Sequence, residues 1–195
     1  TGNTDSGVYA EATGNIEAEN VTASSNDGNG AEFNSLNDVI LTGTNEFRDN
    51  ANSGLYVETG NNIDAENITA NGNGGSGAEL YSVSDVTVSG TNIFTGNEYS
   101  GLYVEAGSDI YIENITADGN GASGIYGSGV ELYTAGLATV AGTNTFINNY
   151  ADGLFIDADG NIFIYDSSAN GNGGSGIFLE ANGNAEITGG VLSNN

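Results

Sequence analysis

Cysteine, histidine, tryptophan, methionine and proline are all absent from this chain of 195 residues. The lack of cysteine excludes a disulfide framework, and the lack of both cysteine and histidine excludes the metal sites that these side chains build. Serine or cysteine triads that use histidine as the base are excluded for the same reason. Any chemistry must therefore come from hydroxyl, amide, carboxylate and aromatic side chains.

Basic residues are almost absent as well. Lysine and arginine together number one, Arg48, against 26 aspartates and glutamates, so the formal net charge is −25. Such a surface repels nucleic acid and anionic membranes, because phosphate binding requires clusters of lysine and arginine. It also argues against acidic polysaccharides as substrates unless a metal bridges the two partners.

Long apolar runs are missing too, and none approaches the roughly 20 residues of a membrane span. We therefore expect no nucleic-acid partner and no direct membrane insertion. The acid excess is typical of a soluble surface that avoids non-specific contacts, which favours an extracellular or cell-surface location. A salt-rich habitat is the alternative explanation of the same excess.

Glycine, in contrast, is abundant and regularly placed. The hexapeptide SGLYVE begins at Ser53 and again at Ser100, 47 residues later, and marks every second unit of a shorter repeat. In that repeat, a glycine followed by alternating apolar residues returns every 23 or 24 residues, with one step of 28, at Gly7, Gly30, Gly54, Gly77, Gly101, Gly129, Gly153 and Gly176. A fixed period of this length is the signature of a repeat architecture.

Each repeat contains three short segments in which apolar residues lie two apart, such as Leu55–Val57, Ile63–Ala65 and Ile68–Ala70. This alternation is typical of strands with one buried face, and the Asn/Gly stretches between them suit turns. One such unit cannot bury its apolar face alone, so successive units must stack. We predict an all-β fold, a β-solenoid of about eight coils of 23–24 residues, in a single domain spanning residues 1–195. Because both ends fall inside a repeat, we expect the chain to be part of a longer protein.

Three strands and 23 to 24 residues per coil resemble the right-handed parallel β-helix, the fold of pectate lyases, phage tailspikes and many bacterial surface passengers. A narrower resemblance is to the FxxN motif of chlamydial polymorphic outer-membrane proteins, at residues 47–50, 94–97 and 146–149. The paired GGAI motif of that family is replaced here by SGLYV-type stretches. The resemblance implies the fold and an adhesin-type surface protein, and says little about activity.

An asparagine lies four positions before each repeat glycine, apart from one insertion, and Asn3 and Asn195 begin and end the series. The predicted structural ladder is formed by Asn26, Asn50, Asn73, Asn97, Asn120, Asn149 and Asn172. An amide is both donor and acceptor, so a stack of amides can satisfy its members in succession. Three residues before each asparagine, large and small core residues alternate: Ala23, Phe47, Ala70, Phe94, Ala117, Phe146, Ala169 and Leu192. This alternation makes two coils the packing unit and explains the spacing of SGLYVE.

Positions two and four after each repeat glycine are expected to point outward, because positions one and three are apolar. There, tyrosine or phenylalanine alternates with glutamate or aspartate along the stack. Sheet packing alone would favour this pattern, since it separates like charges and covers the sheet with rings. A sugar-binding strip would use the same groups, with rings against sugar faces and carboxylates on hydroxyls. The carbohydrate-binding hypothesis names Tyr103, Glu105, Tyr126, Glu131, Tyr133 and Phe155.

Paired carboxylates such as Glu58 and Glu79 are also the groups of glycoside hydrolases. The same diagonal pair recurs along the whole stack, however, whereas a catalytic site is a local exception. Pectate-lyase-like elimination needs a basic proton acceptor, and Arg48 is the only basic side chain. We therefore predict no catalytic residues and no enzyme activity, with polysaccharide cleavage kept as an alternative.

Calcium is the remaining candidate ligand, and no other cofactor is expected. Asp157, Asp159 and Asn161 resemble the opening of a calcium loop but lack its later ligands and terminal glutamate, so a solvated acidic turn is the competing interpretation. Three N-x-T sequons begin at Asn20, Asn67 and Asn114. The repeat alone generates them, so glycosylation is the less favoured interpretation.

The predicted function is that of a non-enzymatic extracellular segment: a rigid stalk, a surface adhesin or a filament module. The alternative is a domain that binds or cleaves polysaccharide. The repeat fails once, where five extra residues at 123–127 predict a loop insertion, and such loops often carry specificity. The expected partners are neutral glycans or other copies stacked end to end through unpaired strand edges.

Overall fold

The computed structural model describes residues 1–121 and 126–195, and within them it contains 24 β-strands and no helix. The strands follow one another in eight groups of three, so that each group forms one coil. The all-β fold and the number of coils are confirmed. No helix in the described residues is long and apolar enough to cross a membrane.

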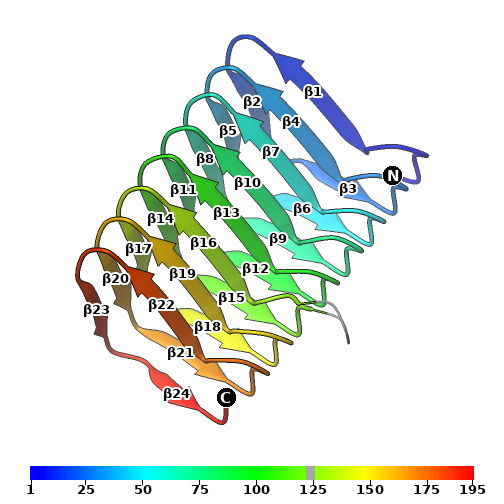
Figure 1. The fold of residues 1–195 in the computed structure, drawn as a ribbon. Helices are drawn as coiled ribbons and strands as arrows, with labels where there is room; N and C mark the ends of the chain where they lie inside the picture. Colours follow the sequence, from blue (N-terminus) through cyan, green and yellow to red (C-terminus); the bar gives the residue numbers. More distant parts are fainter. Residues whose placement is uncertain (122–125) are drawn as a thin grey trace.

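The strands form three eight-stranded parallel sheets, which are stacked along one axis with the two chain ends at opposite ends of the stack (Figure 1). Sheet 1 contains β1 (Val8–Ala12), β4 (Ala31–Ser35), β7 (Leu55–Thr59), β10 (Ala78–Ser82), β13 (Leu102–Ala106), β16 (Val130–Thr134), β19 (Leu154–Ala158) and β22 (Ile177–Ala181). Sheet 2 contains β2 (Ile16–Glu19), β5 (Val39–Thr42), β8 (Ile63–Glu66), β11 (Val86–Ser89), β14 (Ile110–Glu113), β17 (Ala138–Ala141), β20 (Ile162–Tyr165) and β23 (Ala185–Thr188). Sheet 3 contains β3 (Thr22–Ser24), β6 (Asn45–Arg48), β9 (Ile68–Asn71), β12 (Asn92–Thr95), β15 (Ile115–Asp118), β18 (Asn144–Ile147), β21 (Ser167–Asn170) and β24 (Val191–Ser193).

Every strand pairs with its counterpart one coil away. Leu55, for example, lies beside Ala78, which lies beside Leu102. Such pairing without slippage brings equivalent side chains into columns that run along the whole stack. A single position in the repeat therefore decides the chemistry of a complete row.

The core lies between the three sheets and contains the large–small column predicted above. Phe47, Phe94 and Phe146 are fully buried, and each pairs with an alanine in both neighbouring coils. Leu192 departs from the prediction of a buried position, because its exposure is 53%. It belongs to the last described coil, and no further coil covers it.

Steric crowding explains why this position of the repeat is glycine. A Cβ atom on Gly77 would lie 2.4 Å from the carbonyl oxygen of Gly101 and 2.9 Å from Nδ2 of Asn97. Both distances are far too short for real contacts, so a larger residue would separate the coils. Close approach of neighbouring backbones, rather than an unusual φ angle, therefore explains this glycine.

Candidate functional site

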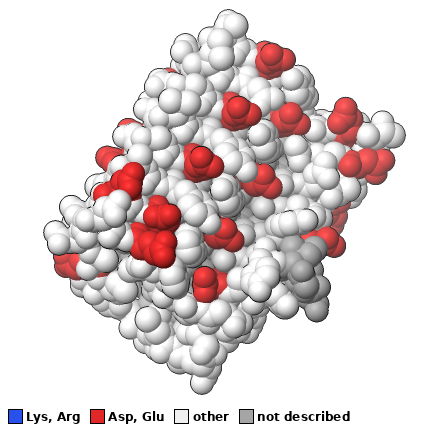
Figure 2. Space-filling view, in the orientation of Figure 1, with Lys and Arg blue, Asp and Glu red and all other residues white. Residues whose placement is uncertain are grey.

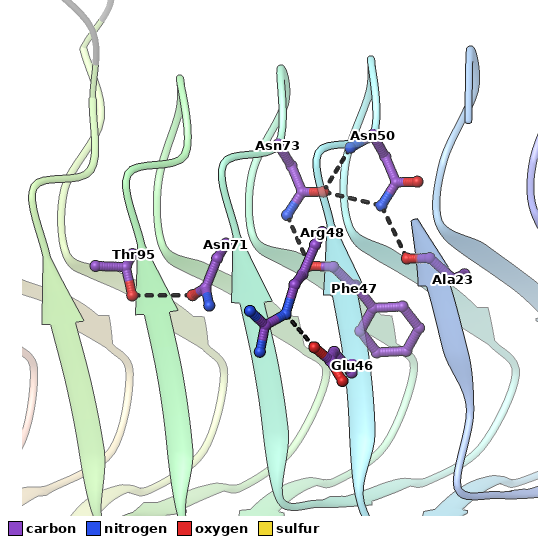
Figure 3. A network of polar contacts seen from close by, with 8 residues as sticks. All are labelled: Ala23, Glu46, Phe47, Arg48, Asn50, Asn71, Asn73 and Thr95. Atoms are coloured by element: carbon purple, nitrogen blue, oxygen red, sulfur yellow. Dashed lines mark hydrogen bonds and ion pairs between the residues drawn. The ribbon is translucent and has the colours of Figure 1, made fainter. Parts of the chain in front are cut away.

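The predicted ladder asparagines lie in one buried row at the corner between sheet 3 and sheet 1. Each donates Nδ2–H to Oδ1 of the next member at 2.8 to 3.0 Å, and Asn3 and Asn195 continue the row at its two ends. From Asn50 to Asn172, the second Nδ2–H points to a backbone carbonyl on the neighbouring coil: Asn50 donates to Ala23 at 3.3 Å and Asn73 to Phe47 at 3.2 Å (Figure 3).

Each ladder oxygen is occupied too. Oδ1 of Asn73 accepts from Nδ2 of Asn50 at 3.0 Å and from its backbone N–H at 3.1 Å. Two donors and two acceptor positions are all that an amide offers. From Asn50 to Asn172 the row therefore has no hydrogen-bonding capacity left for a ligand, and its hydrogen bonds hold successive coils together.

Two further amide rows were not predicted. Asn45, Asn92 and Asn144 are fully buried on alternate coils, and each accepts a backbone N–H from the preceding coil at 3.0 to 3.1 Å. The repeated tripeptide Gly-Thr-Asn at residues 43–45, 90–92 and 142–144 was the available signal. This row fixes the turn between sheets 2 and 3.

The sequon asparagines form the other row. Asn20, Asn67 and Asn114 have left-handed φ angles of 51 to 54°, and their counterparts on the intervening coils are glycines. Asn67 donates Nδ2–H to the Gly43 carbonyl at 3.0 Å, and its Oδ1 accepts from Thr91 N–H at 3.0 Å. A glycan on that nitrogen would disturb a contact between coils.

The outer face of sheet 1 carries a continuous row of rings, which we call the aromatic strip. Successive ring centroids are 5.4 to 5.6 Å apart through Tyr56, Tyr81, Tyr103, Tyr133, Phe155 and Phe178. Glutamates and aspartates occupy the alternating positions, and Figure 2 shows them spaced over this face. Neighbouring rings are tilted by 38 to 44° to one another, except Phe155 and Phe178, which are stacked. These contacts cover part of the ring surface that a sugar would use.

The structure brings five of the six predicted carbohydrate-binding residues together. Glu105 pairs with Tyr133 and Glu131 with Tyr103 across β13 and β16, and Phe155 follows on β19. Tyr126 lies apart from them. It is 87% exposed and meets Tyr150 edge to face at 6.4 Å between ring centroids.

The strip carboxylates are hydrogen-bonded to neighbouring hydroxyls. Glu131 accepts from Tyr133 at 3.4 Å and from Ser100, one coil earlier, at 2.6 Å. Glu79 accepts from Tyr81 at 3.2 Å and from Ser53 at 2.5 Å. Ser6, Ser53 and Ser100 thus each link one coil to a glutamate of the next coil.

Burial and the adjacent carboxylates keep the strip phenols protonated. Burial, followed by the negative charge of Glu58, raises the pKa of Tyr56 to about 12, and burial with Glu131 raises the pKa of Tyr133 to about 12. The pKa values of Tyr81 and Tyr103 are raised by the same causes. At neutral pH these hydroxyls can donate hydrogen bonds but cannot act as bases.

A groove of about 420 Å³ opens where β13, β16 and β19 end. It is lined by Ser82, Glu105, Ala106, Gly107, Tyr133, Thr134, Ala135, Asp157 and Asp159. Sequence reasoning assigned Glu105 and Tyr133 to a sugar site and Asp157 and Asp159 to a calcium site. The fold places all four around one concave surface.

The local geometry gives little support to the calcium hypothesis. Asp159 accepts from Nδ2 of Asn182 at 2.7 Å, and Oδ1 of Asn161 accepts from Asn184 N–H at 2.8 Å. Across the described parts of the chain, no group of three or more acidic, histidine or cysteine side chains is arranged to hold a metal ion. The acidic turn thus contacts the next coil, and calcium binding stays a prediction.

Arg48, the only basic side chain, lies away from the aromatic strip. It is on sheet 3, where its Nε forms an ion pair with Glu46 (Figure 3). Because Arg48 lies on sheet 3, the strip lacks the basic proton acceptor that an elimination reaction would need. Residues 123–125 of the insertion predicted at 123–127 lie outside the described residues. Its last two residues, Tyr126 and Gly127, are described.

A family model described as a right-handed β-helix region matches residues 6–140, which is more than half of the chain. Strands β1 to β16 lie entirely within the matched part. Neither the curated proteins nor the solved structures contain a match to this chain.

Proposed function

The chain belongs to the right-handed β-helix family, and we propose that it serves as a non-enzymatic, rod-like segment of an extracellular or cell-surface protein. Its task is to act as a stalk, or to present an adhesive surface at a distance. Eight coils at about 4.8 Å give a rod of roughly 38 Å.

The observation that carries this proposal is the asparagine ladder, which joins all eight coils and is saturated by its own hydrogen bonds. Among the described residues, every buried side-chain nitrogen and oxygen has a hydrogen-bond partner. A uniform stack whose buried polar side chains are all hydrogen-bonded suits a rigid rod.

The test combines a glycan microarray with an assay for released reducing ends on the bound polysaccharides. We expect no release of reducing ends from any glycan. Binding without release would assign the adhesive form of the proposal, whereas release above the level of a heat-denatured control would contradict it.

Polysaccharide binding or cleavage is the second candidate, and the groove beside Glu105, Tyr133 and Asp157 favours it. If this groove holds a neutral glycan, Tyr133→Ala should remove binding. Tyr165→Ala is the matched control, because Tyr165 lies on sheet 2, outside the groove. Equal binding by both variants and the parent would reject the groove as the site.

A further inference from the structure

The pattern of rings on the outer face of sheet 1 is interrupted at the second coil. On β10 the fourth position after the repeat glycine carries Tyr81, whereas the equivalent residue on β4 is Asn34. The neighbours of the two residues match. Asn34 lies between Glu11 and Glu58. Tyr81 lies between Glu58 and Glu105. One ring is therefore missing from an otherwise unchanged pattern.

The missing ring leaves a groove of about 820 Å³ across β1, β4 and β7, with Tyr9 on one side of Asn34 and Tyr56 on the other. Within the described residues Tyr9 belongs to no ring pair, and Tyr56 pairs only with Tyr81, away from the groove. Two coil spacings separate the sides by about 10 Å. One six-membered ring fits between them near the 5.4 to 5.6 Å centroid spacing found along the aromatic strip. Because described coils form both sides, the groove does not depend on what precedes β1.

The groove is lined by three carboxylates and by no basic side chain. Glu11 accepts through Oε2 from the Tyr9 hydroxyl at 3.1 Å. Glu58 accepts through Oε2 from the Tyr56 hydroxyl at 3.2 Å. Both oxygens of Glu32, between them, accept from neighbouring side chains. Among the described residues no donor contacts Oε1 of Glu11 or of Glu58, so one carboxylate oxygen on each side is available to a ligand.

The negative charge of the groove also acts on its phenol groups. Burial is the largest cause that raises the pKa of Tyr56 to about 12, and the charges of Glu58 and Glu32 raise it further. The only basic side chain, Arg48, lies on sheet 3 and is paired with Glu46. A potential of this sign favours a cation in the groove, and the faces of the rings attract a cation as well. A neutral ligand would use the rings but gain nothing from the charge.

We propose that the groove at Asn34 binds an amino sugar, that is, a pyranose that carries a protonated amine. The sugar ring lies between Tyr9 and Tyr56, in the place that a phenol occupies in the equivalent coil. The amine contacts the available carboxylate oxygen of Glu11 or of Glu58. Nδ2 of Asn34 is engaged within the coil, and its Oδ1 can accept a hydrogen bond from a sugar hydroxyl. A lysine side chain would satisfy the carboxylates but is too thin to fill the space between the two rings.

This inference goes beyond the rod function, which needs no ligand. It also concerns another site than the groove beside Glu105, which lies at β13, β16 and β19. Its failure would therefore leave both proposals of the preceding section untouched.

The experiment is isothermal titration calorimetry of the full chain with a short glucosamine oligomer. The N-acetylated oligomer is the ligand control, because it has the same sugar rings but no charge. We expect one site per chain for the glucosamine oligomer. Its affinity should exceed that of the acetylated form about tenfold, through the carboxylates and the attraction between the amine and the rings.

Three variants locate the site. Asn34→Tyr fills the groove with the ring that the chain carries at Tyr81 and leaves the net charge unchanged, so it should weaken binding by about tenfold or more. Asn170→Tyr is the matched control, because it makes the same change at an exposed outer position of sheet 3. Asn34→Tyr combined with Tyr81→Asn keeps the composition of the parent and should restore binding, since it opens an equivalent groove between Tyr56 and Tyr103. Thermal unfolding verifies that each variant is folded.

Equal affinity of the parent, Asn34→Tyr and Asn170→Tyr would overturn the proposal, because net charge alone would then explain binding. Equal affinity for the acetylated oligomer would reject the role of the amine. A folded exchange variant that does not bind would show that the missing ring does not create the site. A lysine oligomer of the same charge tests the ligand class. If it binds the parent as tightly and is lost equally in Asn34→Tyr, the groove accepts basic peptides and the assignment to an amino sugar is wrong.

Discussion

The asparagine ladder has one buried side chain on every coil, whereas the aromatic strip has one ring on the outer face of each coil from β7 to β22. The ladder is buried, uses the same residue in each coil, and hydrogen-bonds to itself and to backbone carbonyls. The strip is half-exposed, its rings alternate between the second and fourth positions after the repeat glycine as far as Phe155, and phenylalanine replaces tyrosine in the last two coils.

This difference indicates what each row can tolerate. A buried amide that loses its partner cannot be compensated by water, whereas a strip side chain that loses a partner can be solvated. The inner rows should therefore determine stability, and the outer row is where new binding properties can arise at little cost. The predictions below test that division, from the most buried group outward.

The largest effect is expected for Phe94→Ala, in the core column behind the ladder. Phe94 is fully buried, and its neighbours Ala70 and Ala117 are too small to fill the space that the ring leaves. The variant should lose about 3–5 kcal/mol of unfolding free energy. Urea denaturation measures this loss. Leu192→Ala, in the same column but exposed, is the control and should lose much less.

The next effect is that of Asn73→Leu in the ladder. Removal of one amide leaves Asn50 without its acceptor and Asn97 without its donor, which should cost about 1–3 kcal/mol. Asn52→Leu is the control, because Asn52 is exposed at the same corner and lies outside the left-handed region. Asn148 is less suitable, since its φ of 55° would strain a leucine. Equal losses at positions 73 and 52 would remove the reason to treat the ladder as structural.

The fold was predictable from the sequence because each coil repeats the same local pattern, and such coils bury their apolar faces by stacking on their neighbours. The period set the number of coils, and the apolar alternation set which side chains face inward, as at Leu55 and Val57. Leu192 could not be judged correctly from its own repeat, because its burial depends on a neighbouring coil.

The outer features were harder to predict for a related reason. The sequence shows that rings and carboxylates alternate, but the groove beside Glu105 and Asp159 depends on how the turns after β13 and β19 curve. The row of Asn45, Asn92 and Asn144 was visible as a repeated Gly-Thr-Asn. The burial of these asparagines was not visible, because asparagine is common in turns of every kind, where its side chain bonds to the nearby backbone.

A smaller effect is expected in the strip. Tyr81 contacts both Tyr56 and Tyr103 at 5.5 and 5.6 Å between ring centroids, so Tyr81→Leu should lose about 0.5–1.5 kcal/mol beyond the change in buried area. Tyr165→Leu is the control, because no ring pair involves Tyr165 within the described residues. Thermal unfolding of the two variants gives the comparison. A loss at Tyr81 as large as that at Asn73 would show that the strip is structural as well.

The smallest effect concerns the protons of the strip tyrosines. Tyrosine in an unfolded chain has a pKa of about 10, and burial with the adjacent carboxylates raises the pKa of Tyr56 and Tyr133 to about 12 in the folded protein. The folded state therefore binds more protons between these values, so this contribution to stability is complete below about pH 10 and is lost as pH rises towards 12. Tyrosinate absorbance from Tyr56 and Tyr133 should therefore appear at higher pH in the folded chain than in the chain unfolded by urea. Glu58→Gln should lower the pKa of Tyr56 only in part, because burial is the larger cause and the variant leaves it in place. A single step near pH 10 in the folded chain would show that the strip hydroxyls are as free as those of an unfolded peptide.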